Sequence, residues 1–380
     1  MPPFPIFLIS LLLFLALQSS ASGQATKMAD SRSAHAASVA QSNARDREIA
    51  IRFAPVFYQA LGDDRRGDYI TNFDFDGDWR GDNNWVNADD PRFKLRAYVY
   101  FAVSETLTHF FVHYAVFHPR DYKGGKVSGP LLSDAIREGL RRGGRYDPTG
   151  LSKGAVLAHE NDMEGCLVVA VKDGGDLSRA KVMLVETLAH DNFLKYASEE
   201  AALSNLALIR LEAQSPLLYI EPKGHGIFAY TTDKQASRQD IVTYKFKGQA
   251  GDPEAAREDP VGYELLPLFD TLWPRAQNTA SGTFAGVIDY GVMTLSVADR
   301  RGQVRTHRKR LGKLAAAFLG RYGATNAARP PWGWFDRSEP RVPLGSWFFD
   351  PASTVKRHHL PGDSFSTIYL HSPFVGIIRK

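Results

Sequence analysis

The sequence predicts a mainly β protein, an antiparallel β-sandwich with peripheral helices. Segments rich in β-branched and aromatic residues follow one another from position 95 onward, with Gly, Asp and Pro in the connections. Such adjacency favours antiparallel pairing over a parallel sheet with crossover helices. With 380 residues, 44% of them hydrophobic, the chain can bury a large core. The expected strands are Leu95 to Ser104, Thr108 to Phe117, Cys166 to Val171, Val182 to Thr187, Leu217 to Ile220 and Ile241 to Phe246.

The beginning of the chain, residues 1–25, has the pattern of a secretory signal peptide. An apolar run from Phe4 to Leu17 is followed by small and polar residues, and it is shorter than the roughly 20 residues of a membrane-spanning helix. An uncleaved anchor is the alternative. We expect a secreted or periplasmic protein, with a flexible linker over 26–44 and a single β-sandwich domain over 45–380.

Three segments have helical character. Arg45 to Leu61 shows apolar residues at helical spacing, but Pro55 interrupts it, so two short elements are equally compatible. Ser198 to Leu211 is rich in Ala, Leu and Glu, and Thr306 to Leu319 is a second candidate helix with a basic start. Near the end, the aromatic segments Pro330 to Phe335 and Gly345 to Phe349 could line a sugar or lipid site or close the core.

The stretch from Ala158 to Gly165 concentrates an imidazole and three acids where an apolar strand begins. Its ionisable members are His159, Glu160, Asp162 and Glu164. Unpaired charge at a buried strand costs several kcal/mol unless something neutralises it, and a divalent cation would do so. Carboxylate-rich ligands favour Ca²⁺ or Mg²⁺ over Zn²⁺. The sequence therefore predicts a metal site here.

Two motifs resemble the paired signature of the necrosis- and ethylene-inducing peptide-like proteins. The first is Tyr114 to Asp121, the counterpart of a strand of the form Tyr-x-x-Tyr/Phe-x-Pro-Lys-Asp, and the second is Ala158 to Glu164, the counterpart of Gly-His-Arg-His-Asp-Trp-Glu. The resemblance implies that Asp121, His159, Asp162 and Glu164 hold one divalent ion in a cavity.

The resemblance has departures and one extension. Glu160 and Asn161 replace the Arg-His of the family motif, and Met163 replaces its Trp. The segment Lys223-Gly224-His225-Gly226 resembles a Gly-x-His element of the wider superfamily that includes plant proteins related to vacuolar protein sorting.

A second acidic cluster contains Asp74, Asp76 and Asp78, spaced two apart on a glycine-containing turn. These oxygens could bind a structural calcium ion, or they could accept backbone amides in Asx turns. His109 and His113 share a strand face and could add ligands to the main site or be core histidines.

Three functions are compatible with these patterns. The first is a secreted metal-binding protein of the necrosis-inducing-like type that recognises a glycan or lipid headgroup in a metal-organised cavity. The second is a metal-dependent hydrolase with Glu160 or His225 as general base. The third is an ion-stabilised structural or carrier protein, since Cys166 is the only cysteine and no internal disulfide can form.

No familiar hydrolase or nucleotide signature is present, so we favour binding over catalysis. The net charge of +4 is compatible with contact to a membrane surface and does not indicate a nucleic-acid partner. We expect a monomer.

Overall fold

The computed structural model describes residues 39–142, 158–201, 203, 205–231, 240–255, 259–299, 301–359 and 365–379. Residues 46–377 form one compact unit, and residues 1–45 with 378–380 form a second, small one. The predicted signal peptide lies outside the described residues. The last part of the predicted linker belongs to a helix over 39–52, where alanines favour helix over coil. Among the described residues, no helix is long and apolar enough to cross a membrane.

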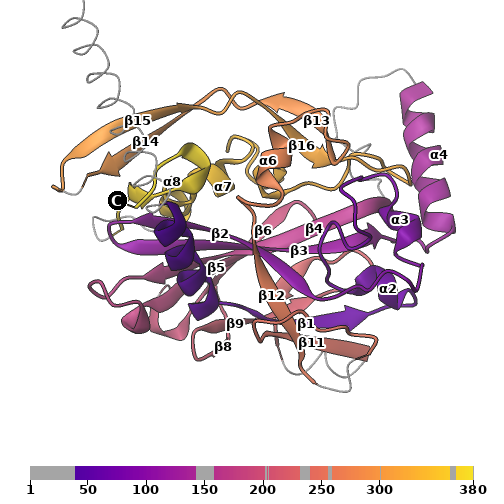
Figure 1. The fold of residues 1–380 in the computed structure, drawn as a ribbon, viewed down its shortest axis with the longest axis horizontal. Helices are drawn as coiled ribbons and strands as arrows, with labels where there is room; N and C mark the ends of the chain where they lie inside the picture. The colour runs from indigo at the N-terminus through magenta and orange to yellow at the C-terminus, as the bar shows by residue number, and fades with distance from the viewer. Residues whose placement is uncertain are drawn as a thin grey trace, which may run out of the picture. The chain divides into compact units, whose positions relative to one another are not determined.

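Most strands belong to one mixed sheet of fifteen strands that curls into a half-barrel (Figure 1). Eleven of them form a continuous hydrogen-bonded path. From one edge to the other these are β10 (Ile227–Ala229), β9 (Ser215–Ile220), β1 (Val56–Leu61), β11 (Asp240–Phe246), β12 (Val261–Pro267), β2 (Tyr98–Thr106), β3 (His109–Asp121), β4 (His159–Val171), β5 (Lys181–Ala189), β6 (Asn192–Ala197) and β7 (Ala207–Leu208). Pairing is antiparallel from β2 to β6, whereas β12 is parallel to both of its neighbours.

Four more strands extend this sheet. They are β8 (Leu211–Glu212) beside β9, β17 (Ile368–His371) beside β2, β14 (Val292–Ala298) beside β17, and β15 (Val304–Arg310) beside β14. A separate two-stranded sheet contains β13 (Phe284–Asp289) and β16 (Lys313–Phe318). The mainly β fold is confirmed. The two stacked sheets of a sandwich are not confirmed, because the structure shows one curled half-barrel sheet and a small separate two-stranded sheet.

All six predicted strands overlap observed ones, namely β2, β3, β4, β5, β9 and β11. The largest difference is in β4, which begins at His159 instead of Cys166. Its first residues are polar, so the apolar pattern does not mark them as strand, yet they pair with β3 up to Asp121. The start of the domain also splits as Pro55 suggested, into the helix over 39–52 and the strand β1.

Apart from the helix over 39–52, the helices in the described part of the chain are mostly short. They are α2 (Arg65–Asp68), α3 (Asn84–Asn87), α4 (Ser128–Arg142), α6 (Trp273–Ala276), α7 (Ser346–Phe349) and α8 (Pro351–His359), with 3-10 turns at Leu177–Arg179, Glu199–Ala201, Pro331–Gly333 and Pro373–Val375.

Two predicted helices are wrong. Ser198 to Leu211 contains one 3-10 turn and then β7. Thr306 to Leu319 forms most of β15 and all of β16, which separate at Gly312, a residue with a φ of +67°. Helix propensity gave way here because pairing with β13 buries the apolar residues of β16.

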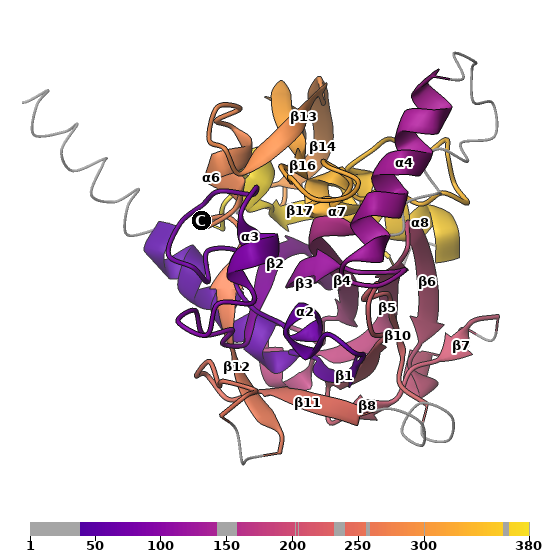
Figure 2. The ribbon, with the colours of Figure 1, turned by 90° about the vertical axis from the view of Figure 1, so that its right-hand side faces the viewer.

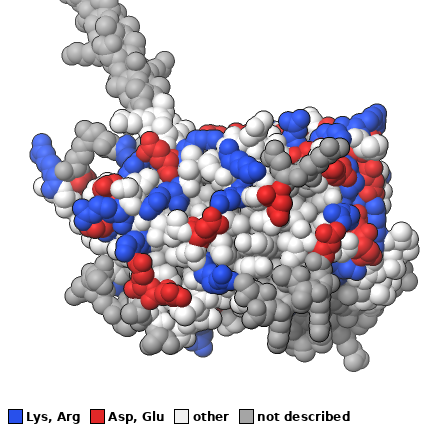
Figure 3. Space-filling view, turned by 90° about the horizontal axis from the view of Figure 1, so that it is seen from below, with Lys and Arg blue, Asp and Glu red and all other residues white. Residues whose placement is uncertain are grey.

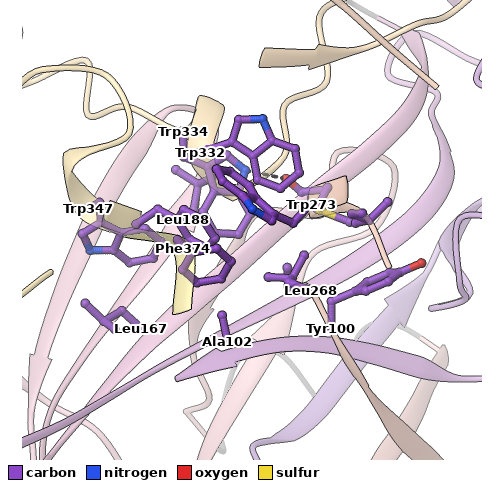
Figure 4. Close-up of a cluster of buried hydrophobic side chains, with 14 of the residues drawn as sticks. Tyr100, Ala102, Leu167, Leu188, Leu268, Trp273, Trp332, Trp334, Trp347 and Phe374 are labelled. Carbon is purple, nitrogen blue, oxygen red and sulfur yellow. Dashed lines mark hydrogen bonds between the residues drawn. The ribbon is translucent and has the colours of Figure 1, made fainter. Parts of the chain in front are cut away.

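The sheet is buried on both faces at its centre, where every residue of β3 is buried. One face packs against aromatic residues from the C-terminal part of the chain. Figure 4 shows four tryptophans above Tyr100, Ala102 and Leu167, namely Trp273, Trp332, Trp334 and Trp347. All four are buried, so the aromatic segments of the tail close the core and do not form a surface for a sugar.

Candidate functional site

The four predicted metal-binding residues lie where β3 ends and β4 begins. Asp121 is the cross-strand partner of His159, and His118 is the partner of Asp162. Asp121, His159, Asp162 and Glu164 are all buried. Figure 2 faces this end of the two strands, with α2, α3 and α4 around it. The structure therefore brings the two motifs of the sequence to one place.

Asn161 determines which way the neighbouring side chains point. It has a φ of +59°, a left-handed conformation that asparagine tolerates better than most residues. Its amide donates to the carbonyls of Gly81 and Leu319, each at 2.8 Å, and its oxygen accepts from Asn84 at 2.7 Å. These bonds hold β4 in its bend.

Glu160 is occupied by backbone groups. Its Oε1 accepts the Trp85 amide at 2.7 Å, and its Oε2 accepts the amides of Arg321 at 2.6 Å and Tyr322 at 3.3 Å. Burial raises the pKa of Glu160 although these three bonds oppose the shift. The carboxylate thus anchors two loops and is not positioned as a general base beside Asp162.

His225 lies between two buried carboxylates. Its Nδ1 donates to Asp162 Oδ2 at 2.8 Å, and its Nε2 donates to Asp68 Oδ1 at 3.2 Å. Burial alone would lower the pKa of His225, but the bonds to Asp162 and Asp68 outweigh it and raise the pKa to about 9. Asp68 also accepts the Gly62 amide and the Tyr122 hydroxyl, both at 2.6 Å. His225 is therefore a charged, doubly bonded group that orients Asp162.

His118 lies flat against His225, with ring centroids 3.7 Å apart. Its Nε2 donates to Gln59 Oε1 at 3.0 Å. Burial and the charge of His225 hold the pKa of His118 well below its ordinary value. One neutral and one charged imidazole are thus stacked beneath Asp162.

Asp121 faces two nitrogen groups. Its Oδ2 is 3.7 Å from both Lys123 Nζ and His159 Nε2, and its Oδ1 accepts the Lys123 amide at 2.9 Å. His159 donates from Nδ1 to the Asn161 carbonyl at 2.7 Å, which leaves Nε2 on the side of Asp121. Metal-binding histidines commonly have this arrangement. Burial raises the pKa of Asp121 in spite of the two nitrogen neighbours.

Lys123 connects this group to a more exposed chain of contacts. Its Nζ donates to His190 Nδ1 at 2.9 Å, and His190 Nε2 pairs with Glu221. Its positive charge also acts to lower the pKa values of Asp121, Asp162 and Glu164. Lys123 therefore supplies a cation of the protein's own to the acidic group.

Glu164 is the least compensated carboxylate of the site. Its Oε1 accepts the His190 amide at a long 3.4 Å, and its buried Oε2 has no hydrogen-bond partner among the described residues. Burial, followed by the charges of Asp162 and Asp191, raises its pKa well above the ordinary value. An unpaired buried carboxylate oxygen fits a cation site by its chemistry.

As arranged in the described part of the chain, no group of three or more His, Cys, Asp or Glu side chains is close enough to hold a metal ion. The donor types at the site suit Ca²⁺ or Mg²⁺, but the side chains would have to turn toward one another to bind it.

The second acidic cluster forms Asx turns. Asp76 Oδ1 accepts the Asp78 amide at 3.1 Å, and Asp78 Oδ1 accepts the Arg80 amide at 2.7 Å. An asparagine side chain donates to one oxygen of each carboxylate, with Asn72 on Asp74, Asn87 on Asp76 and Asn83 on Asp78. These bonds match the alternative without an ion, and the calcium site stays a prediction.

His109 and His113 do not contact the main site. His113 donates to the Trp347 carbonyl at 2.9 Å, and His109 packs on Phe365. Both are buried, which fits core histidines.

Sequence patterns missed Asp68, Lys123 and His190. Only Lys123 carried a signal, because it follows Asp121 by two positions. Asp68 in α2 and His190 in the β5–β6 turn reach the site only through the fold.

No protein-family model and no curated protein matches the chain. Solved structures match it in part. They include one described as a toxin fold for microbial attack and plant defence (15% identity, 50% of this chain and 70% of the other, TM-score 0.26), NLPPya in complex with mannosamine (16%, 49% and 66%, 0.25) and the non-toxic HaNLP3 protein (13%, 58% and 73%, 0.26). These are necrosis- and ethylene-inducing proteins, the family that the two motifs resemble. At these TM-scores the similarity does not support a conclusion about the function of this chain. The resemblance to the vacuolar-sorting-related proteins stays a prediction.

Proposed function

We propose that this chain is a secreted or periplasmic divalent-cation-binding protein that recognises a glycan or lipid headgroup at the junction of β3 and β4. The observation that supports this most is the buried carboxylate group of Asp121, Asp162 and Glu164, in which Glu164 keeps an unpaired oxygen. Three buried carboxylates repel one another, so a divalent cation would be favoured between them.

In this proposal Asp121, His159, Asp162 and Glu164 hold the ion. A bound Ca²⁺ or Mg²⁺ supplies coordination positions for hydroxyl or phosphate oxygens of a ligand. The protein's own contribution is orientation, because His225 and Asp68 fix Asp162.

A half-exposed donor adds a polar contact beside this group. Lys123 lies at its exposed side and can donate a hydrogen bond to the ligand's oxygens. The ligand would therefore meet a divalent cation and an ammonium donor together.

The hydrolase alternative receives less support. Both of its candidate bases are engaged, Glu160 by three backbone amides and His225 by two carboxylates. A general base must accept a proton from water or substrate, and a histidine with a pKa of about 9 is already protonated at neutral pH.

Calorimetric titration with CaCl₂ and with MgCl₂ tests the cation. Wild type should bind one ion at the β3–β4 junction, and Asp162→Asn should weaken it by tenfold or more. The control is Asp173→Asn, an exposed carboxylate that pairs with Arg179. Equal affinities in the two variants, or no binding by wild type, would remove the site.

Ligand recognition needs its own test. Glucosamine and mannosamine, and vesicles that carry glycosylated headgroups, are suitable probes in calcium and in EDTA. The proposal expects binding that requires the cation and leaves the probe chemically intact. Turnover of a phosphoester or glycoside that is lost in Asp162→Asn would favour the hydrolase.

A further inference from the structure

A second surface of the protein is strongly basic. Residues 301–313 contain six Lys or Arg residues and no acid, whereas the whole chain has 46 basic and 42 acidic residues. The chain's net charge is therefore 46 − 42 = +4, and the chain without this segment has +4 − 6 = −2. The positive charge of this protein is thus concentrated in one short stretch.

This stretch contains β15, one strand of an exposed two-stranded ribbon. β15 pairs with β14 from Val292↔Arg310 to Ala298↔Val304, and it has no other strand partner among the described residues. The ribbon lies at the margin of the molecule beyond α7 and α8 (Figure 1). Leu295 is buried on its inner side, while Arg308 and Arg310 are exposed on its outer side. The outer side is therefore free to meet a partner.

The central cations of β15 are not neutralised by the protein. Arg308, Lys309 and Arg310 have no ion pair in the part of the chain that the structure describes, and Arg305 has only a long one to Asp299 at 3.8 Å. Several exposed cations elsewhere do have ion pairs. Each of the following pairs with a nearby acid: Arg65, Arg92, Arg179, Lys181 and Lys245. On the side away from the ribbon, basic and acidic residues are interspersed (Figure 3).

The ribbon combines this charge with aliphatic side chains. Val292 is 48% exposed and Val304 is 52% exposed, both on the strands that carry the arginines. Neither β14 nor β15 contains Phe, Tyr or Trp, the residues on which the bases of single-stranded nucleic acids stack. The positions from Arg305 to Arg310 span about 17 Å in an extended strand.

We propose that the outer side of the β14–β15 ribbon docks on an anionic lipid surface. Lys and Arg residues are attracted to such a surface by about 1 kcal/mol each, which is about a fivefold change in partitioning. The exposed valines lie at the level of the headgroups. This contact involves no residue of the β3–β4 site, so it does not require a divalent cation.

The test uses the full chain and vesicle sedimentation at low salt in EDTA. Vesicles of phosphatidylcholine with about 30% phosphatidylserine are compared with phosphatidylcholine alone. Substituting Gln at Arg308 and Arg310, the two arginines on the outer side, should weaken binding to the anionic vesicles about 25-fold. The control substitutes Gln at Arg92 and Arg179, which lowers the net charge equally. It should change binding no more than a few fold, with both variants melting near wild type.

Four results would overturn the proposal. One is absence of binding to anionic vesicles by wild type. Another is equal weakening in the two double variants, which would show that only net charge matters. The third is tighter binding to a 20-base-pair DNA duplex than to the vesicles, because a β-ribbon can also enter a major groove. If the charges serve only to prevent edge pairing of β15, the ribbon variant should aggregate without losing vesicle binding, which would also refute docking.

Discussion

Lys123→Met tests whether the lysine acts as the internal cation of the acidic group. The substitution removes the charge and keeps an unbranched apolar stem of similar length. At the observed 3.7 Å from Asp121, two unit charges attract by about 4.5 kcal/mol at an effective dielectric constant of about 20, and by about 1 kcal/mol in water. Since the Lys123 side chain is 35% exposed, we expect a loss near the lower end, about 1 to 2.5 kcal/mol.

This loss converts into a measurable melting temperature. Unfolding entropy of about 2.1 cal/mol/K per residue over residues 46–377 amounts to about 0.7 kcal/mol/K. In EDTA the variant should therefore melt about 1 to 4 °C below wild type. In saturating calcium this difference should shrink by about 2 °C, because a bound ion no longer meets a neighbouring ammonium and calcium affinity should rise by about tenfold, or about 1.4 kcal/mol.

Thermal unfolding in EDTA and in CaCl₂, with calorimetric titration of calcium, checks both parts. Lys126→Met is the matched control, because Lys126 is 37% exposed and pairs with Asp64 and Asp89 instead. The reasoning is refuted if Lys123→Met responds to calcium no more than Lys126→Met, or if it binds calcium more weakly than wild type.

Three further predictions concern the surroundings of the site. Asp68→Asn leaves the proposed metal donors in place but removes one carboxylate from the charged His225; urea unfolding should show a loss of about 3 to 5 kcal/mol, and a loss under 1 kcal/mol would contradict the buried ion pair. Gly165→Ala would place its Cβ 2.3 Å from the Tyr114 carbonyl and 2.4 Å from the Trp334 ring, so we expect a cost of about 1 to 3 kcal/mol, against under about 0.5 kcal/mol for Gly175→Ala, where the new Cβ meets nothing within 4 Å. Burial lowers the pKa of His113 to about 4, although its bond to the Trp347 carbonyl opposes this shift. As the pH drops, His113 is therefore protonated in the unfolded chain before it is protonated in the folded protein. The free energy of unfolding should fall by at most about 3 kcal/mol between about pH 6.5 and pH 4. Urea titrations across that range should show a smaller fall in His113→Gln than in wild type, and an unchanged pH dependence would be the contrary result.

The sequence predicted the strands better than the helices for a physical reason. Six apolar segments indicated strands, and each overlaps one, because burial on both faces of the central sheet leaves continuous apolar runs. Helix propensity failed at Thr306 to Leu319, where pairing with β13 and β14 decides the conformation. Curling of the sheet could not be predicted, because it depends on the pairing order of strands that are distant in sequence.

The residues of the candidate site were also predicted only in part. Asp121, His159, Asp162 and Glu164 could be placed together because two motifs flank paired strands. Asp68 could not, since it comes from α2, and the motif around His225 did not reveal that this histidine lies between Asp68 and Asp162. Glu160 shows that the spacing of residues along a strand does not by itself determine where a side chain points. It shares a strand with Asp162, yet the left-handed Asn161 between them sends its carboxylate to the amides of Trp85 and Arg321.

The charges around Asp162 indicate which ion the site would prefer. At full ionisation, Asp68, Asp121, Asp162 and Glu164 carry four negative charges, and Lys123 and His225 return two positive ones. The remainder of two negative charges equals one divalent cation. A monovalent ion would leave one buried charge uncompensated, and so would a single proton. Without a divalent ion, Glu164 is the carboxylate that favours the proton, because burial and the charge of Asp162 raise its pKa. Calcium or magnesium should therefore displace a proton from Glu164 on binding. Calcium titrations in buffers of different ionisation enthalpy should show this proton release, and a release that persists in Glu164→Gln would assign it to another group.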